Sequence, residues 1–194
     1  FSDQFKIMFN FGSGAEFNRA NSIDCAPEES MNASLPADYY GLSKNIIAQK
    51  IAKMNSNIYN LRLFGCFGQH EESQRLFRSC YDKFNDGQNA EISYDKYMDY
   101  FYAQDVGRVI DFIVNGPSPL TPRDINLCYT RKYKLSDYAN KIKKLTNSDS
   151  SVIIYNKELT KPYTGSGERL KSLNIDLVGL NKGIEECLKS WSKS

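Results

Sequence analysis

The sequence predicts an α/β fold with a mostly parallel sheet and a smaller α/β lobe beside it. Short apolar runs of strand length alternate along the chain with longer amphipathic runs of helix length. This alternation is typical of parallel strands joined by crossover helices. A chain of 194 residues that is 41% hydrophobic and 13% aromatic is also long enough to bury a sizeable core.

The first predicted element is a buried strand over 5–12, which stops abruptly at Gly12-Ser13-Gly14. A polar loop is expected over 13–36, followed by a helix over 37–55. Pro36 and Asp38 are helix start signals, and apolar residues follow at helical intervals. Those apolar residues are Leu42, Ile46, Ile47, Ile51 and Met54. Because open α/β sheets bind ligands at the carboxyl ends of their strands, Ser13 is placed where it could contact one.

The rest of the chain continues the alternation. Further strands are expected at 58–65, 90–94, 98–102, 124–129 and 151–155, and further helices at 71–85, 103–115, 135–146, 167–173 and 180–192. Strands 5–12, 58–65 and 124–129 would form the main parallel sheet. The elements from 71 to 101, and from about 134 onward, would form the smaller lobe.

Composition excludes several classes of function. A net charge of +2 and a pI near 8.2 give no basic surface for nucleic acid. No apolar stretch is long enough to span a bilayer, and no signal peptide is visible, so no membrane partner is expected. The cysteines are widely spaced and form no C-x-x-C pair, which indicates reduced thiols in a cytoplasmic protein. They are Cys25, Cys66, Cys80, Cys128 and Cys187. His70 is the only histidine, so no metal centre is indicated.

Tyr40 and Lys44 are the strongest candidates for chemistry. The spacing i,i+4 places both side chains on one helix face, and an ammonium beside a phenol favours the phenolate. Such a pair is a usable general acid/base. The alternative is an exposed tyrosine and a solvated lysine, because a chain with 13 tyrosines is expected to contain such a spacing by chance. The surrounding sequence must therefore decide.

The order of several motifs resembles a known family. GSGAEF after the first strand is followed by YYGLSK, by the strand NLRLFGCFG, by YMDYFYAQDVGRVIDFIV, and near the end by ERLKSLNIDLVGLNKGIEECLKSW. This order is similar to that of the extended short-chain dehydrogenase/reductases, and within them the NAD-dependent epimerase/dehydratase group that acts on nucleotide-sugars. The resemblance covers nearly the whole chain. It implies a partial Rossmann-type, mostly parallel sheet with a smaller α/β substrate lobe.

The resemblance also implies a domain layout. Residues 1–70, with a returning strand near 124–129, would be the C-terminal part of the dinucleotide-binding domain, and residues 71–194 would be mainly the substrate-binding lobe. Family members begin with a glycine-rich turn that holds the cofactor pyrophosphate. The two G-S-G sequences here do not complete G-x-G-x-x-G, because Phe17 and Leu170 occupy the final positions. We therefore expect a C-terminal portion of a longer protein that binds no dinucleotide by itself.

The roles of individual residues are carried over from the family motifs. Tyr40 would move the proton of a sugar hydroxyl while NAD or NADP takes the hydride. Lys44 would also bind the nicotinamide ribose, and Ser13 would hydrogen-bond the sugar, unless it only caps a turn. The backbone of Phe64 would approach the nicotinamide. Arg75 is a candidate for substrate phosphates, although helix arginines are usually solvated.

Three positions depart from the family pattern. Gly65 stands where many relatives have an asparagine that contacts the sugar diphosphate, and Met98 stands where many have a phosphate-binding arginine. Ala15 replaces residues that do extra proton work in many dehydratases, which argues against a standard 4,6-dehydratase. These departures put ordinary UDP-sugar recognition in doubt.

The predicted function is therefore an NAD(P)-dependent nucleotide-sugar epimerase, dehydratase or reductase with a Tyr-Lys-Ser site. The alternative is a non-catalytic protein of the same fold that senses the cofactor or acts as a scaffold. A homodimer is expected from the family, formed by the helices 37–55 and 71–85. The apolar residues of the first helix could equally be buried against its own sheet.

Overall fold

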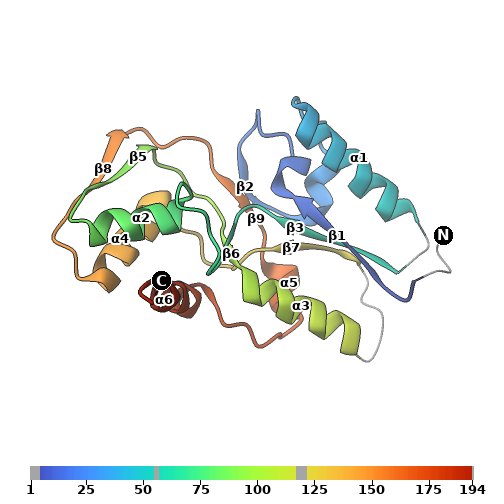
Figure 1. Cartoon of the computed structure of the whole chain (residues 1–194). Helices are drawn as coiled ribbons and strands as arrows, with labels where there is room; N and C mark the ends of the chain where they lie inside the picture. The colour runs from blue at the N-terminus through green and yellow to red at the C-terminus, as the bar shows by residue number, and fades with distance from the viewer. Residues whose placement is uncertain (1–4, 55–56, 117–121, 194) are drawn as a thin grey trace.

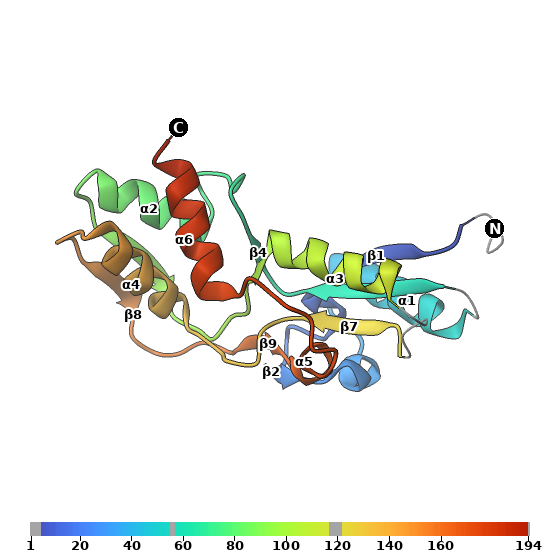
Figure 2. The same cartoon turned by 90° about the horizontal axis from the view of Figure 1, so that it is seen from below.

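The computed structural model describes residues 5–54, 57–116 and 122–193. Figure 1 shows two parts side by side. The first lobe contains the main sheet, with a long helix above it and another below it in this view, and the second lobe contains three helices and a pair of strands. Figure 2 shows the same division from below. The predicted α/β class with mostly parallel strands is confirmed.

The main sheet has three parallel strands in the order β1-β3-β7. They are β1 (Met8–Ser13), β3 (Ile58–Leu63) and β7 (Asp124–Leu127). The register places Ser13 beside Leu63, and Leu63 beside Leu127, so the carboxyl ends of the strands lie together. All three strands were expected from their apolar runs, within a few residues at each end.

One face of this sheet is apolar because every second strand residue is apolar. Leu61, Ile125 and Leu127 are almost fully buried there against α3 (Ala103–Asn115). Burial of each large aliphatic side chain contributes roughly 1.5–3 kcal/mol. This contact fixes α3 on the sheet. The bounds of α3 are those that the sequence predicts, 103–115.

The opposite face of the same strands is polar. Asn60, Arg62 and Asn126 are buried there beneath α1 (Tyr39–Lys53) and the segment 14–36. The expected loop over 13–36 is wrong in part, because this segment contains the short 3-10 helices η2 (Gly14–Glu16) and η3 (Glu28–Asn32) and the strand β2 (Ile23–Ala26). β2 pairs in parallel with β9 (Tyr163–Gly165), which comes from the other end of the chain.

Helix α1 starts where the sequence indicates. The Asp38 carboxylate accepts a hydrogen bond of 2.8 Å from the Gly41 amide, which is a standard N-cap contact. The helix packs inward through small or polar residues, including Asn45 and Ala48. The apolar residues Ile46 and Ile47 instead remain 44% and 42% exposed. The apolar stripe of this helix is therefore only partly buried against the chain's own sheet.

The second lobe is built around aromatic residues. α2 (Leu76–Asn85), α4 (Leu135–Thr146) and α6 (Leu180–Trp191) enclose its core, and β5 (Ala90–Tyr94) pairs in parallel with β8 (Val152–Asn156). Phe77 of α2 stacks on Phe67 with ring centroids 4.4 Å apart. Phe67 belongs to β4 (Cys66–Phe67), which pairs with β6 (Phe101–Tyr102) close to the junction with the first lobe.

Three sequence expectations for this region need correction. The helix expected over 71–85 begins only at Leu76, because residues 68–75 form turns. The strand expected over 98–102 is reduced to β6, with only an isolated bridge at Met98. α5 (Glu168–Ser172) was expected in the second lobe, but it packs on β7, with Leu170 in the core of the first lobe.

Glu71 lies in the turn before α2 with a side chain only 2% exposed, and the Arg75 Nε is 3.6 Å away. Burial raises the pKa of this carboxyl to about 7, although Arg75 opposes the shift. In the unfolded chain this carboxyl loses its proton near pH 4.5, whereas in the folded chain it keeps the proton up to about pH 7. The free energy of unfolding therefore falls as the pH rises from about 4.5 to about 7. We expect Glu71→Gln to stabilise the protein by on the order of 2 kcal/mol above pH 7.

Urea unfolding at pH 4.5, 6 and 8 measures this effect. The gain in Glu71→Gln should shrink toward pH 4.5. Glu72→Gln is the matched control, because Glu72 is the exposed neighbour, and it should show no such pH dependence. A gain in Glu71→Gln that is equal at all three pH values would contradict the prediction.

Candidate active site

Ser13 lies at the carboxyl end of β1 and makes contacts in two directions. Its hydroxyl accepts a hydrogen bond of 3.2 Å from the Ala15 amide, which caps η2. Its own amide donates to Oε1 of Glu16 at 2.9 Å. The Ser13 side chain also lies near the phenol of Tyr163 and acts to lower the pKa of that phenol. Ser13 is thus a turn cap, and it also faces a second polar side chain at the end of the strand.

Tyr40 and Lys44 lie one turn apart at the start of α1. The Lys44 amine donates to the carbonyl of Phe11 in β1 at 2.9 Å, two residues before Ser13. Tyr40 is 55% exposed, and it lies near enough to Tyr163 to contribute to the raised pKa of that phenol. The helix and the strand therefore bring Ser13, Tyr40 and Lys44 to the same end of β1.

Tyr163 is a site residue that the sequence reasoning missed. It begins β9 and packs edge-on against Phe64, with ring centroids 5.2 Å apart. Burial raises the pKa of its phenol to about 12, so it stays protonated near neutral pH. Tyr163 is 150 positions from Ser13 in the printed sequence, and no local pattern relates the two. The pairing of β9 with β2 and a bridge between Tyr163 and Met98 hold Tyr163 at this place in the folded chain.

Phe64 follows β3, and its ring is buried between Phe17 and Tyr163. Gly14 and Gly165 lie against this ring so closely that a Cβ on either would clash with it. The G-S-G sequences at 12–14 and 165–167 therefore serve close packing. They lead only into η2 of three residues and α5 of five residues, which supply no long helix to hold a pyrophosphate.

Arg75 lies just before α2 and is about half exposed. Its guanidinium donates to the carbonyl of Cys66 at 3.1 Å and lies beside Glu71. The structure thus gives Arg75 protein partners that hold the turn 66–75. Its neighbours Gln74 and Leu76 line the cavity described below.

Close packing explains why position 65 is a glycine here and not the asparagine of many relatives. A Cβ at this position would lie 2.8 Å from the backbone carbonyl of Asp99 and equally close to the Tyr100 ring. No side chain fits there without movement of the backbone. The asparagine found in many relatives therefore has no place in this chain.

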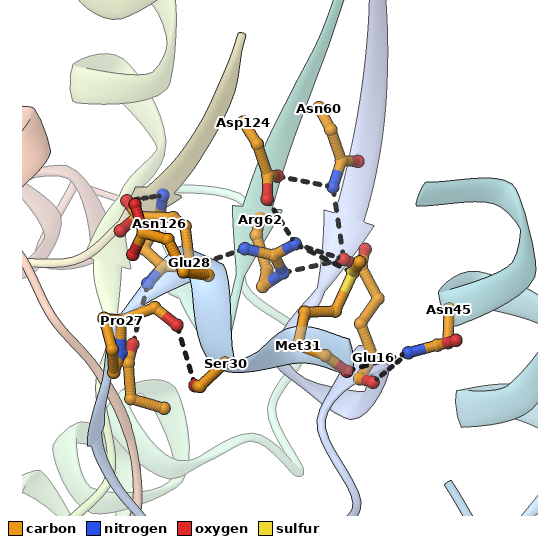
Figure 3. A network of polar contacts seen from close by, with 12 residues as sticks. Glu16, Pro27, Glu28, Ser30, Met31, Asn45, Asn60, Arg62, Asp124 and Asn126 are labelled. Carbon is orange, nitrogen blue, oxygen red and sulfur yellow. Dashed lines mark hydrogen bonds and ion pairs between the residues drawn. The ribbon is translucent and has the colours of Figure 1, made fainter. Parts of the chain in front are cut away.

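A buried polar network supports the site from below (Figure 3). The Arg62 guanidinium binds Oε2 of Glu16 at 2.7 Å, Oδ2 of Asp124 at 2.9 Å and Oδ1 of Asn126 at 2.8 Å. Asn60 donates to both Glu16 and Asp124. Burial raises the pKa of Glu16, and Arg62 opposes that shift. Because Glu16 also accepts from the Ser13 amide, the network fixes the end of β1.

The sequence contains a pattern that indicates this network and that the expectations above do not include. Asn60 and Arg62 alternate with apolar residues in β3, and Asp124 and Asn126 do the same in β7. Polar residues at every second position of two parallel strands indicate one shared polar face. Glu16 could not be assigned to that face, because it lies outside any strand.

The second lobe contains a cavity of 480 Å³ between α2 and β5. Such a volume is within the usual range for small-molecule sites. Its walls combine aliphatic side chains with hydroxyl and charged groups. Its lining includes Leu76, Lys83, Glu91, Ile92, Lys96 and Thr160.

In the part of the chain that the structure describes, no group of three or more His, Cys, Asp or Glu side chains is arranged to hold a metal ion. No helix among these residues combines the length and apolarity needed to cross a bilayer.

The parallel sheet, the polar groups at the carboxyl end of β1 and the adjoining smaller lobe define a Rossmann-like α/β protein of two lobes. The model of the NAD dependent epimerase/dehydratase family matches residues 3–128. The chain belongs to this family. A comparison with curated protein sequences finds no match.

Solved structures of the same fold include several nucleotide-sugar enzymes. A GDP-D-glycero-L-gluco-heptose synthase from Campylobacter jejuni, in the presence of NADPH, aligns with 97% of this chain and 70% of its own, at 14% identity and a TM-score of 0.80. A GDP-L-fucose synthetase from Naegleria fowleri bound to NADP aligns with 97% of this chain and 64% of its own, at 15% identity and a TM-score of 0.77.

A UDP-glucose 4-epimerase from Thermotoga maritima with UDP-glucose aligns with 98% of this chain and 64% of its own, at 16% identity and a TM-score of 0.75. The chain thus spans about two thirds of the length of these enzymes. At such identities the likeness concerns the fold.

Proposed function

We propose that this chain carries the acid/base site and the substrate lobe of an NAD(P)-dependent nucleotide-sugar epimerase, dehydratase or reductase. One observation supports the proposal above all: Ser13 ends β1, and Lys44, one turn after Tyr40 in α1, donates to the Phe11 carbonyl of the same strand. Open parallel sheets bind their ligands at this edge. The family membership and the nucleotide-sugar enzymes of the same fold support the same conclusion.

Tyr40 would take or give the proton of a sugar hydroxyl, and Ser13 would hold that hydroxyl in place. The protonated phenol of Tyr163 is available as a further donor to the sugar. A bound NAD or NADP would supply the hydride chemistry. The exposed position of Tyr40 leaves its hydroxyl accessible to a substrate.

The residues present fit the nicotinamide half of such a cofactor. The Lys44 ammonium has three donors, of which one reaches the Phe11 carbonyl. The other two remain for ribose hydroxyls. The backbone after Phe64 would border the nicotinamide. The packed glycines at 14 and 165 do not fit the pyrophosphate, so neither of these two turns provides a cradle for that group.

The cavity of the second lobe would hold the nucleotide part of the substrate. It lies between α2 and β5, and Arg75 precedes α2. Arg75 remains a candidate for substrate binding because about half of its side chain is exposed. A substrate of this kind would then extend from the second lobe to Tyr40 on the first.

A cytoplasmic homodimer is also part of the proposal. The exposed pair Ile46 and Ile47 on α1 supports an interface through this helix. α2 is not a suitable second helix, because Phe77, Tyr81 and Phe84 point into the core of its own lobe. It also lies at the far end of the molecule from α1 (Figure 1).

Thermal unfolding of the intact protein with NAD, NADP and a panel of UDP-, GDP- and dTDP-sugars tests the proposal. A ligand that binds only the folded state raises the melting temperature. We expect a rise with one dinucleotide and with at least one nucleotide-sugar. A rise with a dinucleotide alone would favour the alternative function of a cofactor sensor, for which Gly65 and Met98 would mark lost substrate contacts. No rise with any of these ligands would contradict both.

A further inference from the structure

Lys96 is a half-buried cation without an acidic partner in the described part of the chain. Its side chain lines the cavity of the second lobe. No ion pair or side-chain hydrogen bond engages its amine among the described residues. Lys83, which lines the same cavity, is paired with Glu91 at 3.3 Å. The two lysines therefore differ in the one property that matters for an anionic ligand, which is an uncompensated charge.

The backbone holds Lys96 in a defined place. Its amide donates to Oδ1 of Asp95 at 3.1 Å, and its carbonyl accepts from the Leu135 amide at 3.0 Å. Asp95 is itself buried and binds Ser136. The backbone that carries this amine is thus already fixed, so little backbone entropy is lost when a ligand binds.

Lys96 also lies between the cavity and the candidate acid/base site. Its amine is 5.8 Å from the centre of the Tyr163 ring. The phenol of that same tyrosine lies near the side chain of Ser13, which acts to lower its pKa. One side chain, Tyr163, therefore connects the cavity lysine to the end of β1. In a nucleotide-sugar, the diphosphate occupies the corresponding place between the nucleoside and the sugar.

Arg19 does not add a second uncompensated cation. Burial and the neighbouring charge of Arg19 both lower the pKa of the Lys96 amine. Arg19 is itself paired with Asp38 at 2.8 Å, so the uncompensated charge at this place is that of Lys96.

We propose that Lys96 binds the diphosphate of the nucleotide-sugar and so supplies the charge that Met98 lacks. This inference rests on the proposed function. It assigns the phosphate contact to the segment after β5. The nucleoside would lie on the cavity side of Lys96, and the sugar would lie on the Tyr163 side.

Calorimetric titration of the intact protein tests this assignment with four probes: UDP, GDP, the matching nucleosides and inorganic pyrophosphate. Hydrogen bonds to charged groups are worth about 1.5–3 kcal/mol. Lys96→Met should therefore weaken the nucleoside diphosphate that the wild type binds by about 10-fold to 100-fold. Its affinity for the nucleoside should change by less than about threefold. Lys96→Arg should keep most of the affinity.

Lys83→Met is the matched control, because it removes a lysine from the same cavity whose charge is already paired. It should weaken the diphosphate by less than about threefold. Equal losses in Lys83→Met and Lys96→Met, or an unchanged diphosphate affinity in Lys96→Met, would overturn the assignment. Melting temperatures of both variants show whether either change has disturbed the fold, and Lys96→Arg retains a test if Lys96→Met unfolds.

The probes also separate this inference from the proposed function. If pyrophosphate binds in a Lys96-dependent way while no nucleoside diphosphate or nucleotide-sugar binds, the anion site stands and the proposed function fails. If nucleoside diphosphates bind equally well in Lys96→Met, the proposed function stands and the role of Lys96 is wrong.

Discussion

Replacement of Arg62 by methionine is expected to destabilise the protein by about 3–5 kcal/mol. The Arg62 side chain is fully buried and forms ion pairs with Glu16 at 2.6 Å and with Asp124 at 2.9 Å. Methionine fills a similar volume but leaves the Glu16 carboxylate buried without a cation. Removal of one partner from a buried charge network leaves an uncompensated charge, which costs more than the loss of the contact itself.

Chemical unfolding at pH 8 measures this loss. Burial already raises the pKa of Glu16 in the wild type, and the loss of Arg62 should raise it further. The variant can then take up a proton at Glu16, so its deficit should be smaller at pH 5 than at pH 8. The double variant Arg62→Met/Glu16→Gln should recover part of the stability for the same reason.

Arg108→Met is the control for the removal of an arginine as such. Arg108 pairs with Asp176 on the surface, and exposed pairs contribute about 0–1 kcal/mol. The account of the polar face would be wrong if Arg62→Met and Arg108→Met lost the same small amount of stability. A loss in Arg62→Met that did not depend on pH would also contradict it.

The second large effect concerns catalysis. In the intact enzyme, Tyr40→Phe should lower kcat by at least about a hundredfold, which is the usual contribution of a positioned acid/base group. The change removes only the hydroxyl. The ring is 55% exposed, so packing and the melting temperature should stay almost the same. Turnover of the nucleotide-sugar that gives a melting-temperature rise provides the assay.

Tyr39→Phe is the matched control, because Tyr39 is the adjacent residue of the same type and is 93% exposed. It should retain near-normal turnover. If Tyr40→Phe also retained it, Tyr40 would not be the proton-transfer group. A similar fall in both variants would indicate a general disturbance of the start of α1.

The sequence predicted those parts of the fold that local signals determine. The three strands of the main sheet are apolar runs of strand length, and Asp38 marks the start of α1 through a contact with Gly41 three residues later. Spacing within one short motif also placed Tyr40 and Lys44 on one helix. Such features depend on neighbours in the chain, and the printed sequence contains them directly.

The features that were missed depend on residues far apart in the sequence. β2 pairs with β9, and the Cys25 amide donates to a threonine 139 positions away. Tyr163 reaches the site through this pairing and through its bridge to Met98, both of which join distant parts of the chain. In α1, periodicity correctly indicated a helix but could not show which face would be buried. The buried face uses Asn45 and Ala48 because the surface beneath it is polar and closely packed.

The polar face of the sheet explains why the candidate site was only partly predictable. Ser13, at the end of a strand, is visible as a candidate in the sequence. The groups that hold it, Glu16 and Arg62, are 46 positions apart and meet only in the folded chain. Lys96 was not considered, because a lysine after a strand has no distinctive pattern until its cavity and its missing partner are seen.

The tight contact around Gly65 has a consequence for how this chain differs from its relatives. An asparagine placed there would have to displace the carbonyl of Asp99 and the ring of Tyr100. The exchange of this one position with that of a relative therefore cannot restore the relative's contact. The backbone at Asp99 and the ring of Tyr100 have to move before a side chain fits at position 65, so enzymes engineered from this scaffold should exchange the segment 99–100 together with position 65.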